Sequence, residues 1–304
     1  MKLPNWVLPG SAVFFCMAGL RGSAVLRGSA VLHGLAVLFL GLALSGCTLV
    51  LSPTGRVEAL AADSGMAEVL VPDRRLRAFS KITGGAADAG AALTIYIESD
   101  GAPWITPTQP PYDPTPLKPV VMQMAAADPA RSVAYLGRPC QYLEERALDD
   151  CDPSLWTLGR FSEVAVSASQ AAVSELKRRA GASRINLVGY SGGGAMAALV
   201  AARRQDVACL VTLASPLDTD AWTDAIDATR LRESLNPVDY AAALAKLPQT
   251  HFTGTRDKTV PPASIRRFTG RIPAARVIAL ADFTHTCCWA DEWLSLMKRS
   301  CLAR

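Results

Sequence analysis

Short apolar runs alternate with segments of helix length across most of the chain. The runs typical of strands lie at 93–97, 132–136, 184–190, 207–213, 250–253 and 275–280, and helices are expected at 162–180, 192–204 and 289–299. Strands separated by helix-length segments form βαβ units, in which neighbouring strands run parallel. This alternation predicts an α/β fold with a mostly parallel central sheet flanked by helices.

The composition suits a single large core. Half of the 304 residues are hydrophobic and 19% are charged, which excludes a disordered chain. Residues 68–71 and 77–79 are candidate antiparallel edge strands that precede the core. Residues 102–119 contain seven prolines and predict a long irregular loop. Because no linker divides the rest of the chain, we expect residues 47–304 to form one domain.

Residues 1–46 differ in character from the rest and predict an export signal. They carry no acidic residue and few basic ones, and an apolar run at 35–44 is followed by small residues. A basic start, a short apolar run and a small-residue cut site are the marks of a signal peptide. The run is shorter than the roughly 20 residues of a membrane-spanning helix, so an uncleaved anchor is the less favoured alternative.

The end of this segment, Leu44-Ser45-Gly46-Cys47, resembles the lipobox of bacterial lipoproteins. The resemblance implies cleavage before Cys47 and acylation of that residue, which would tie the protein to a membrane. Thr48, rather than Asp, follows the cysteine, which in Gram-negative bacteria implies the outer membrane, facing the periplasm. Loss of residues 1–46 lowers the formal net charge from +4 to +1. We therefore expect no nucleic-acid partner.

Six cysteines remain in the expected mature domain besides Cys47. An exported domain can keep disulfides, and Cys140 and Cys151 are a plausible local pair. Cys209 lies in an apolar strand pattern and is expected to be a buried free thiol. The partners of Cys287, Cys288 and Cys301 are left open. The spacings match no zinc site, and no cofactor is expected.

A sharp turn between the strand at 184–190 and the helix at 192–204 carries Gly189-Tyr190-Ser191-Gly192-Gly193. This is the Gly-x-Ser-x-Gly pattern, in which a serine nucleophile projects from a strained strand–turn–helix junction. Glycines flank it because side chains there would collide with the strand and helix. The Gly192 N–H is then a donor for an oxyanion, and Ser191 is the predicted nucleophile.

A serine nucleophile requires a base and a carboxylate that orients it. His285 follows the strand at 275–280 and is the predicted base, whereas His251 starts a strand and is expected to be structural. Asp257 follows the strand at 250–253 and is the predicted orienting carboxylate. Asp218 and Asp282 are rivals for that role.

The second oxyanion donor should come from the loop after the strand at 93–97. We assign it to a backbone N–H at Asp100 or Gly101; a plain turn is the alternative. Arg138, Cys140 and Trp289 could line the site, but we favour the interpretation that the cysteine and tryptophan hold loops in place.

Several motifs together resemble an uncharacterised family of bacterial α/β-hydrolase lipoproteins. The resemblance covers most of residues 90–295 and rests on Tyr96-Ile-Glu-Ser-Asp-Gly101, Asp113-Pro-Thr-Pro116, Tyr135-Leu-Gly-Arg-Pro-Cys-Gln-Tyr142, Leu187-Val-Gly-Tyr-Ser-Gly-Gly-Gly194, Ser234-Leu-Asn-Pro237 and Thr284-His-Thr-Cys-Cys-Trp289. It implies an α/β-hydrolase fold and places Ser191, Asp257 and His285 on the family's triad positions.

These observations predict a secreted, lipid-anchored serine hydrolase that acts on a small acyl substrate, most simply a carboxylic ester. A peptidase of the same fold is one alternative, although no acidic cluster for a peptide N-terminus is evident. A non-catalytic envelope lipoprotein that keeps the scaffold for binding is another. The sequence does not name the substrate or the oligomeric state.

Overall fold

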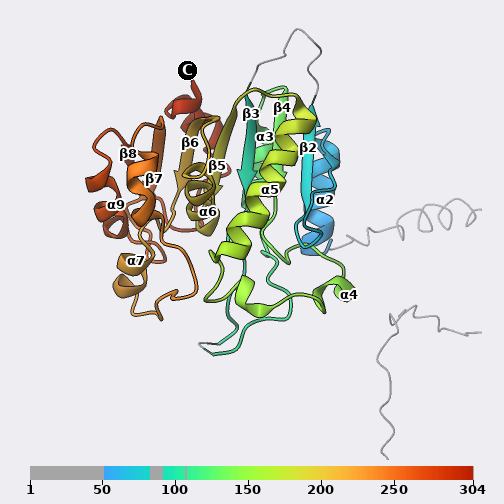
Figure 1. The fold of residues 1–304 in the computed structure, drawn as a ribbon, viewed down its shortest axis with the longest axis horizontal. Coiled ribbons are helices and arrows are strands. Elements are labelled where there is room, and N and C mark those ends of the chain that lie inside the picture. Colours follow the sequence, from blue (N-terminus) through green and yellow to red (C-terminus); the bar gives the residue numbers. More distant parts are fainter. Residues whose placement is uncertain (1–50, 83–91, 107, 304) are drawn as a thin grey trace, which may run out of the picture. The chain divides into compact units, whose positions relative to one another are not determined.

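The computed structural model describes residues 51–82, 92–106 and 108–303 (Figure 1). The expected signal peptide and the lipidation site at Cys47 lie outside the described residues. Leu51–Arg304 forms one compact unit. Within the described ranges, no helix combines the length and the apolar character needed to cross a membrane.

One eight-stranded sheet, in the order β1-β2-β4-β3-β5-β6-β7-β8, organises this unit. Its strands are β1 (Ala67–Glu68), β2 (Ala78–Ile82), β3 (Leu93–Ile97), β4 (Ser132–Leu136), β5 (Ile185–Tyr190), β6 (Val207–Leu213), β7 (Gln249–Gly254) and β8 (Arg276–Leu280). β2 pairs antiparallel with both β1 and β4, and all the other neighbours are parallel. The predicted mostly parallel sheet is confirmed.

Helices cover both faces of the sheet. They are α2 (Pro53–Asp63), α3 (Val120–Ala127), α4 (Glu145–Leu148), α5 (Glu163–Ala180), α6 (Gly192–Ala201), α7 (Thr219–Ala225), α8 (Ala241–Leu244), α9 (Arg266–Arg271) and α10 (Trp293–Lys298). Short 3-10 turns lie at Pro153–Leu155, Pro237–Tyr240, Pro262–Ile265 and Cys301–Ala303. α5 and α6 cross in front of the sheet in Figure 1, while α2, α3 and α10 share the core on the other face.

Alternation along β3 shows how the two cores form. Leu93, Ile95 and Ile97 join the apolar cluster beneath α5 and α6, whereas Tyr96 joins the cluster beneath α3 and α10. Successive side chains of a strand point to opposite faces, so a strand covered on both faces is mostly apolar, and Thr94 is the polar exception in β3. All five residues of β3 are accordingly buried.

The longest helix, α5, begins and ends where its sequence predicts. Ser162 is its N-cap, and the side-chain oxygen accepts from Ala165 N at 3.4 Å. Gly181 ends the helix with a φ of 60°, a left-handed conformation that glycine adopts at little cost.

Other boundaries differ from the prediction. The helix expected at 192–204 ends at Ala201, because Arg204 turns back to form a two-pronged ion pair with Asp206 before β6. The helix expected at 289–299 begins only at Trp293. The edge strand expected at 68–71 is reduced to Ala67–Glu68. α3 was not predicted, because its eight residues are mostly apolar and give no helical periodicity.

The cysteines form three disulfides within the described ranges. Cys140–Cys151 is the expected local pair. The expectation of a free thiol at Cys209 is wrong, because the turn after α10 returns to β6 and pairs Cys209 with Cys301. Cys287 and Cys288, adjacent in the chain and joined by a cis peptide bond, form the third.

Candidate active site

Ser191 stands at the junction of β5 and α6 in a backbone conformation that few non-glycine residues adopt, with φ 54° and ψ −129°. The surrounding glycines make this junction possible. A methyl group on Gly189 would lie 2.2 Å from the carbonyl oxygen of Gly193, and one on Gly193 would lie 2.2 Å from that of Ile97. Because backbone atoms cannot yield, the turn requires the absence of side chains, and it holds Ser191 at the carboxyl edge of the sheet.

The structure brings together the three residues that the sequence analysis placed in a triad. Ser191 Oγ lies 3.0 Å from His285 Nε2, and His285 Nδ1 lies 2.9 Å from Asp257 Oδ2. The imidazole therefore bridges the hydroxyl and the carboxylate, with one ring nitrogen toward each. The serine follows β5, the aspartate follows β7 and the histidine follows β8.

The Asp257 carboxylate is fully buried and anchored by its own turn. Its Oδ1 accepts hydrogen bonds from the amides of Thr259 at 2.9 Å and Val260 at 2.8 Å. These bonds leave Oδ2 for His285. Neither rival carboxylate contacts the imidazole: Asp218 caps α7 and pairs with Arg267 at 2.9 Å, and Asp282 is exposed.

Two aromatic side chains fix the backbone of His285. The hydroxyl of Tyr190 donates to the His285 carbonyl oxygen, and Trp289 Nε1 donates to the same oxygen at 2.9 Å. The Trp289 indole also donates to the Thr284 carbonyl at 3.1 Å. Trp289 thus holds the loop that presents the base.

The other described histidine, His251, has a different environment. It is buried in β7, with Nδ1 2.8 Å from Thr212 Oγ1 and Nε2 3.0 Å from Gln249 Oε1. Burial lowers the pKa of His251 to about 3, so the ring is neutral at pH 7. Both of its nitrogens are occupied within the sheet, so the side chain is structural.

The two predicted oxyanion regions lie in contact. A methyl group on Gly192 would lie 1.9 Å from Asp100 Oδ1, so the turn after β3 packs directly against the start of α6. Neither the Gly192 amide nor the Asp100 amide has a hydrogen-bond acceptor among the described residues. Gly101 has a φ of 69° and lies against Pro114, where a methyl group would be 2.0 Å from the carbonyl oxygen. Of the two candidates, Asp100 is therefore the one beside Gly192.

Four buried polar residues around this turn have roles that the sequence analysis did not identify. Glu98 is fully buried and accepts from the hydroxyls of Tyr135 at 2.9 Å and Tyr142 at 3.2 Å. Burial raises the pKa of its carboxyl group. Arg138, Arg160 and Gln141 complete the group. Glu98, Arg138 and Gln141 lie in motifs that carry the family resemblance, but the sequence pattern does not show that these distant segments converge.

A cavity of about 580 Å³ lies beside the loop of His285. It is bounded by α2, by the start of α3 and by residues after the histidine, including Thr286, Cys288 and Trp289, while Ser191 is not among its lining residues. Within the described ranges, no group of three or more His, Cys, Asp or Glu side chains is placed to hold a metal ion.

Comparison with known proteins identifies the fold. The sequence profile described as "alpha/beta hydrolase fold" matches residues 144–233. No curated protein matches the chain at a significant level. Similar solved structures include an esterase of Pyrococcus furiosus, with a TM-score of 0.56, 15% identity and coverage of 79% of this chain and 94% of the esterase. Est1E from Butyrivibrio proteoclasticus has a TM-score of 0.53 at 14% identity, with 79% and 99% covered.

Larger proteins share the same architecture. The acylaminoacyl peptidase of Pyrococcus horikoshii has a TM-score of 0.54 at 14% identity over 77% of this chain, which spans only 39% of that peptidase. At these identities the likeness concerns the fold alone. Together with the sheet topology, it establishes that the chain has the α/β-hydrolase fold.

Proposed function

We propose that the protein is a serine hydrolase that cleaves carboxylic esters. The observation that carries this proposal is the unbroken chain of hydrogen-bonding contacts from Asp257 through His285 to Ser191. Such a chain is the arrangement that activates a hydroxyl as a nucleophile at neutral pH.

The geometry assigns each residue a step. Ser191 Oγ attacks the ester carbonyl while His285 Nε2 takes its proton, and the same proton then passes to the departing alcohol. Asp257 keeps the proton of the neutral imidazole on Nδ1 and stabilises the imidazolium that forms. A water molecule, deprotonated by His285, releases the acid from Ser191 by the reverse sequence.

The negative charge on the carbonyl oxygen of the intermediate needs donors that are already in place. We assign them to the backbone N–H groups of Gly192 and Asp100. Both groups lack acceptors within the described protein, and the side chain of Asp100 lies against Gly192. Gly192 is also the first residue of α6, where the positive end of the helix dipole favours an anion.

The comparisons favour an ester over a peptide as the substrate class. The similar esterases are matched over nearly their whole length, whereas this chain spans 39% or less of the acylaminoacyl peptidase and of a puromycin hydrolase. A peptidase activity remains the second candidate because these enzymes share the fold. Turnover of aminoacyl amides without turnover of simple esters would select it.

Labelling with a fluorophosphonate tests the nucleophile. We expect the purified protein to become covalently labelled and to hydrolyse p-nitrophenyl esters of short acyl chains, and Ser191→Ala to do neither. Rates for acyl chains of increasing length would then define the acyl site. Equal labelling of the two proteins would contradict the assignment, and an inert wild-type protein would favour the non-catalytic binding lipoprotein.

We further propose that the protein is exported and anchored by lipid at Cys47, facing the periplasm from the outer membrane. Support comes from the lipobox-like residues 44–47 and from the three disulfides, since disulfides persist in oxidising compartments. Cells grown with labelled palmitate should label the wild-type protein and not Cys47→Ser. Label in both, or in neither, would count against acylation at this residue.

A further inference from the structure

The turn after β3, residues 98–101, is held by side chains from a distant segment; we call it the oxyanion turn. Gln141 Nε2 donates to the Ser99 carbonyl oxygen at 2.9 Å, and the Ser99 amide donates to Glu98 Oε1 at 2.7 Å. The Ser99 carbonyl and the Asp100 amide belong to one planar trans peptide, so they point in opposite directions. Because Gln141 holds the Ser99 carbonyl oxygen toward its own side chain, the Asp100 N–H points to the side away from Gln141.

The side chain of the same aspartate is held by two arginines. Asp100 Oδ1 lies 2.8 Å from Arg138 Nη1, and Oδ2 lies 3.1 Å from Arg160 Nη1. The arginine side chains are only 4% and 5% exposed, and that of Asp100 is 11% exposed. Arg138 also donates to the carbonyl oxygen of Arg160, its Nε has no acceptor among the described residues, and the carboxylate that it pairs with is that of Asp100.

Charge explains why two arginines are useful at this point. A carboxylate in contact with Gly192 would oppose the formation of an oxyanion there, because the two negative charges would lie in a buried site of low effective dielectric. Two guanidinium groups against one carboxylate reverse the sign of the local charge. Another carboxyl at this turn is that of Glu98, which accepts from the hydroxyls of Tyr135 and Tyr142 and whose pKa is raised by burial.

The segment that carries Gln141 is itself in an unfavourable conformation. The residues on either side, Cys140 and Tyr142, have φ values of 69° and 60°, in the left-handed region that is unfavourable for a non-glycine residue. Such strain persists only where the surroundings impose it. Here it brings the amide of Gln141 to the oxyanion turn.

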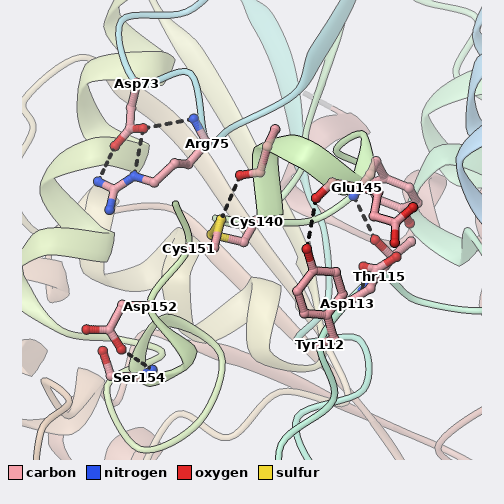
Figure 2. The surroundings of a disulfide bond; sticks show 12 residues. Asp73, Arg75, Tyr112, Asp113, Thr115, Cys140, Glu145, Cys151, Asp152 and Ser154 are labelled. Carbon is pink, nitrogen blue, oxygen red and sulfur yellow. Dashed lines mark hydrogen bonds and ion pairs between the residues drawn. A yellow bond between two sulfur atoms is a disulfide. The ribbon is translucent and has the colours of Figure 1, made fainter. Parts of the chain in front are cut away.

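Several ties impose that conformation. Cys140 is joined to Cys151, and Thr115 Oγ1 accepts from the Tyr142 amide at 2.7 Å. Figure 2 shows the disulfide beside Tyr112, whose hydroxyl donates to the Glu145 carbonyl at 3.0 Å and so links the proline-rich loop to α4. The disulfide closes a loop that lies between Arg138 and Arg160 in the sequence. It therefore restrains the backbone next to Arg138 and Gln141.

We propose that Gln141, Arg138 and Arg160 are positioning residues that aim the Asp100 N–H into the oxyanion hole and neutralise the Asp100 carboxylate beside it. This inference rests on the proposed esterase function and deepens it. Within the described residues, these three side chains are hydrogen-bonded to the oxyanion turn and not to Ser191. They act only through the oxyanion turn, so their effect belongs to the transition state and not to the binding of substrate.

Gln141→Met tests the proposal, with Gln249→Met as its matched control. Both glutamines are buried, and both donate hydrogen bonds from Nε2 to backbone carbonyl oxygens. The acceptors of Gln249 are the carbonyl oxygens of Leu244 at 2.8 Å and Leu247 at 3.1 Å. Only Gln141 contacts the oxyanion turn. We expect Gln141→Met to lower kcat about 10- to 100-fold with KM within about twofold, because a misdirected donor costs nearly as much as a lost one. Gln249→Met should keep the wild-type kcat.

The affinity for a trifluoromethyl ketone gives a second readout, since its adduct with Ser191 carries an oxyanion. We expect this affinity to fall by the same factor as kcat in Gln141→Met and to be unchanged in Gln249→Met. A folded Gln141→Met protein with the wild-type kcat and inhibitor affinity would overturn the positioning role. If the wild-type protein neither hydrolyses esters nor labels with fluorophosphonate, the proposed function fails instead.

Should Gln141→Met fail to fold, Arg160→Lys carries the same test. It keeps the charge but loses the planar fork that reaches both Asp100 and the Thr157 carbonyl. Its control is Arg204→Lys, which breaks a comparably buried two-pronged pair with Asp206 away from the oxyanion turn. We expect a fall in kcat of about tenfold for Arg160→Lys alone. Equal kcat values for the two variants would overturn the proposal.

Discussion

The two sides of the site are built in opposite ways. The turn around Ser191 depends on side chains that are absent, because methyl groups on Gly189 or Gly193 would overlap backbone atoms at 2.2 Å. The oxyanion turn depends on side chains that are present, contributed by Gln141, Arg138 and Arg160. The first is encoded within six consecutive residues and the second across more than sixty. Substitutions should therefore affect the two sides through different properties, which four experiments can separate.

The largest loss of kcat should come from a substitution in the proposed triad, because the reaction requires the triad whichever side of the site is intact. We expect Asp257→Asn to lower kcat by about 10⁴-fold, because an amide cannot hold the imidazole proton on the nitrogen that leaves Nε2 free to act as a base. Asp282→Asn is the control, since that carboxylate is 84% exposed and near the same loop. Steady-state kinetics on one ester would decide, and a similar loss in both variants would argue against Asp257.

The next effect concerns the glycine side of the comparison. We expect Gly189→Ala to destabilise the protein by about 3 kcal/mol or more, because its methyl group would meet the backbone of Gly193. Gly270→Ala adds the same group in α9, where no atom lies within 4 Å, and should leave the stability unchanged or slightly raised. Urea unfolding of both proteins makes the comparison. A stable, active Gly189→Ala protein would refute the steric account of this turn.

Removing the Cys140–Cys151 or the Cys209–Cys301 disulfide should distinguish an effect on the oxyanion turn from an effect on stability alone. In the chain-entropy estimate, removing Cys140–Cys151 costs about 3 kcal/mol and removing Cys209–Cys301, which closes a longer loop, about 4.5 kcal/mol. Only the first holds the segment with Gln141. We therefore expect Cys140→Ser/Cys151→Ser to lower kcat about tenfold and Cys209→Ser/Cys301→Ser to keep it, although the second pair unfolds at lower urea. The reverse order in kcat would break the link between this disulfide and the oxyanion turn.

The smallest effect is a dependence of stability on pH in the sheet beneath the turn around Ser191. Burial lowers the pKa of His251 from 6.5 to about 3, so between these values the unfolded chain binds a proton that the folded chain does not. The free energy of unfolding should therefore fall as the pH drops below 6.5, by up to about 1.4 kcal/mol per pH unit from this group. His251→Gln should show a shallower fall in urea unfolding from pH 6.5 to 4. An unchanged slope would mean that other groups dominate.

The same contrast explains what could be predicted from the sequence. The strands, α5 with its caps, and the turn at Ser191 follow from local patterns: alternation, a serine before the helix, glycine after it. Asp257 and His285 could be placed because parallel strands deliver the residues that follow them to one edge of the sheet. Each of these inferences uses only neighbours in the chain or the direction of a strand.

What could not be predicted depends on contacts between distant segments. Gln141 gives no local signal, because its role requires the left-handed residues beside it and the turn after β3. Cys209 was misjudged for the same reason, since its partner lies 92 residues away on a turn that returns to β6. α3 was not predicted because its residues are mostly apolar and show no helical periodicity. They are apolar because α3 is buried between α2, α10 and the sheet, and this position is known only from the fold.

The hydrogen bond from Tyr190 to the carbonyl of His285 has a mechanical consequence. Tyr190 immediately precedes Ser191, the proposed nucleophile, and its hydroxyl donates to the backbone of His285, the proposed general base. Because of this hydrogen bond, the turn at Ser191 and the loop that carries His285 should move together. The separation between hydroxyl and imidazole should then fluctuate less than the position of either loop, and the pair should survive or collapse together on heating.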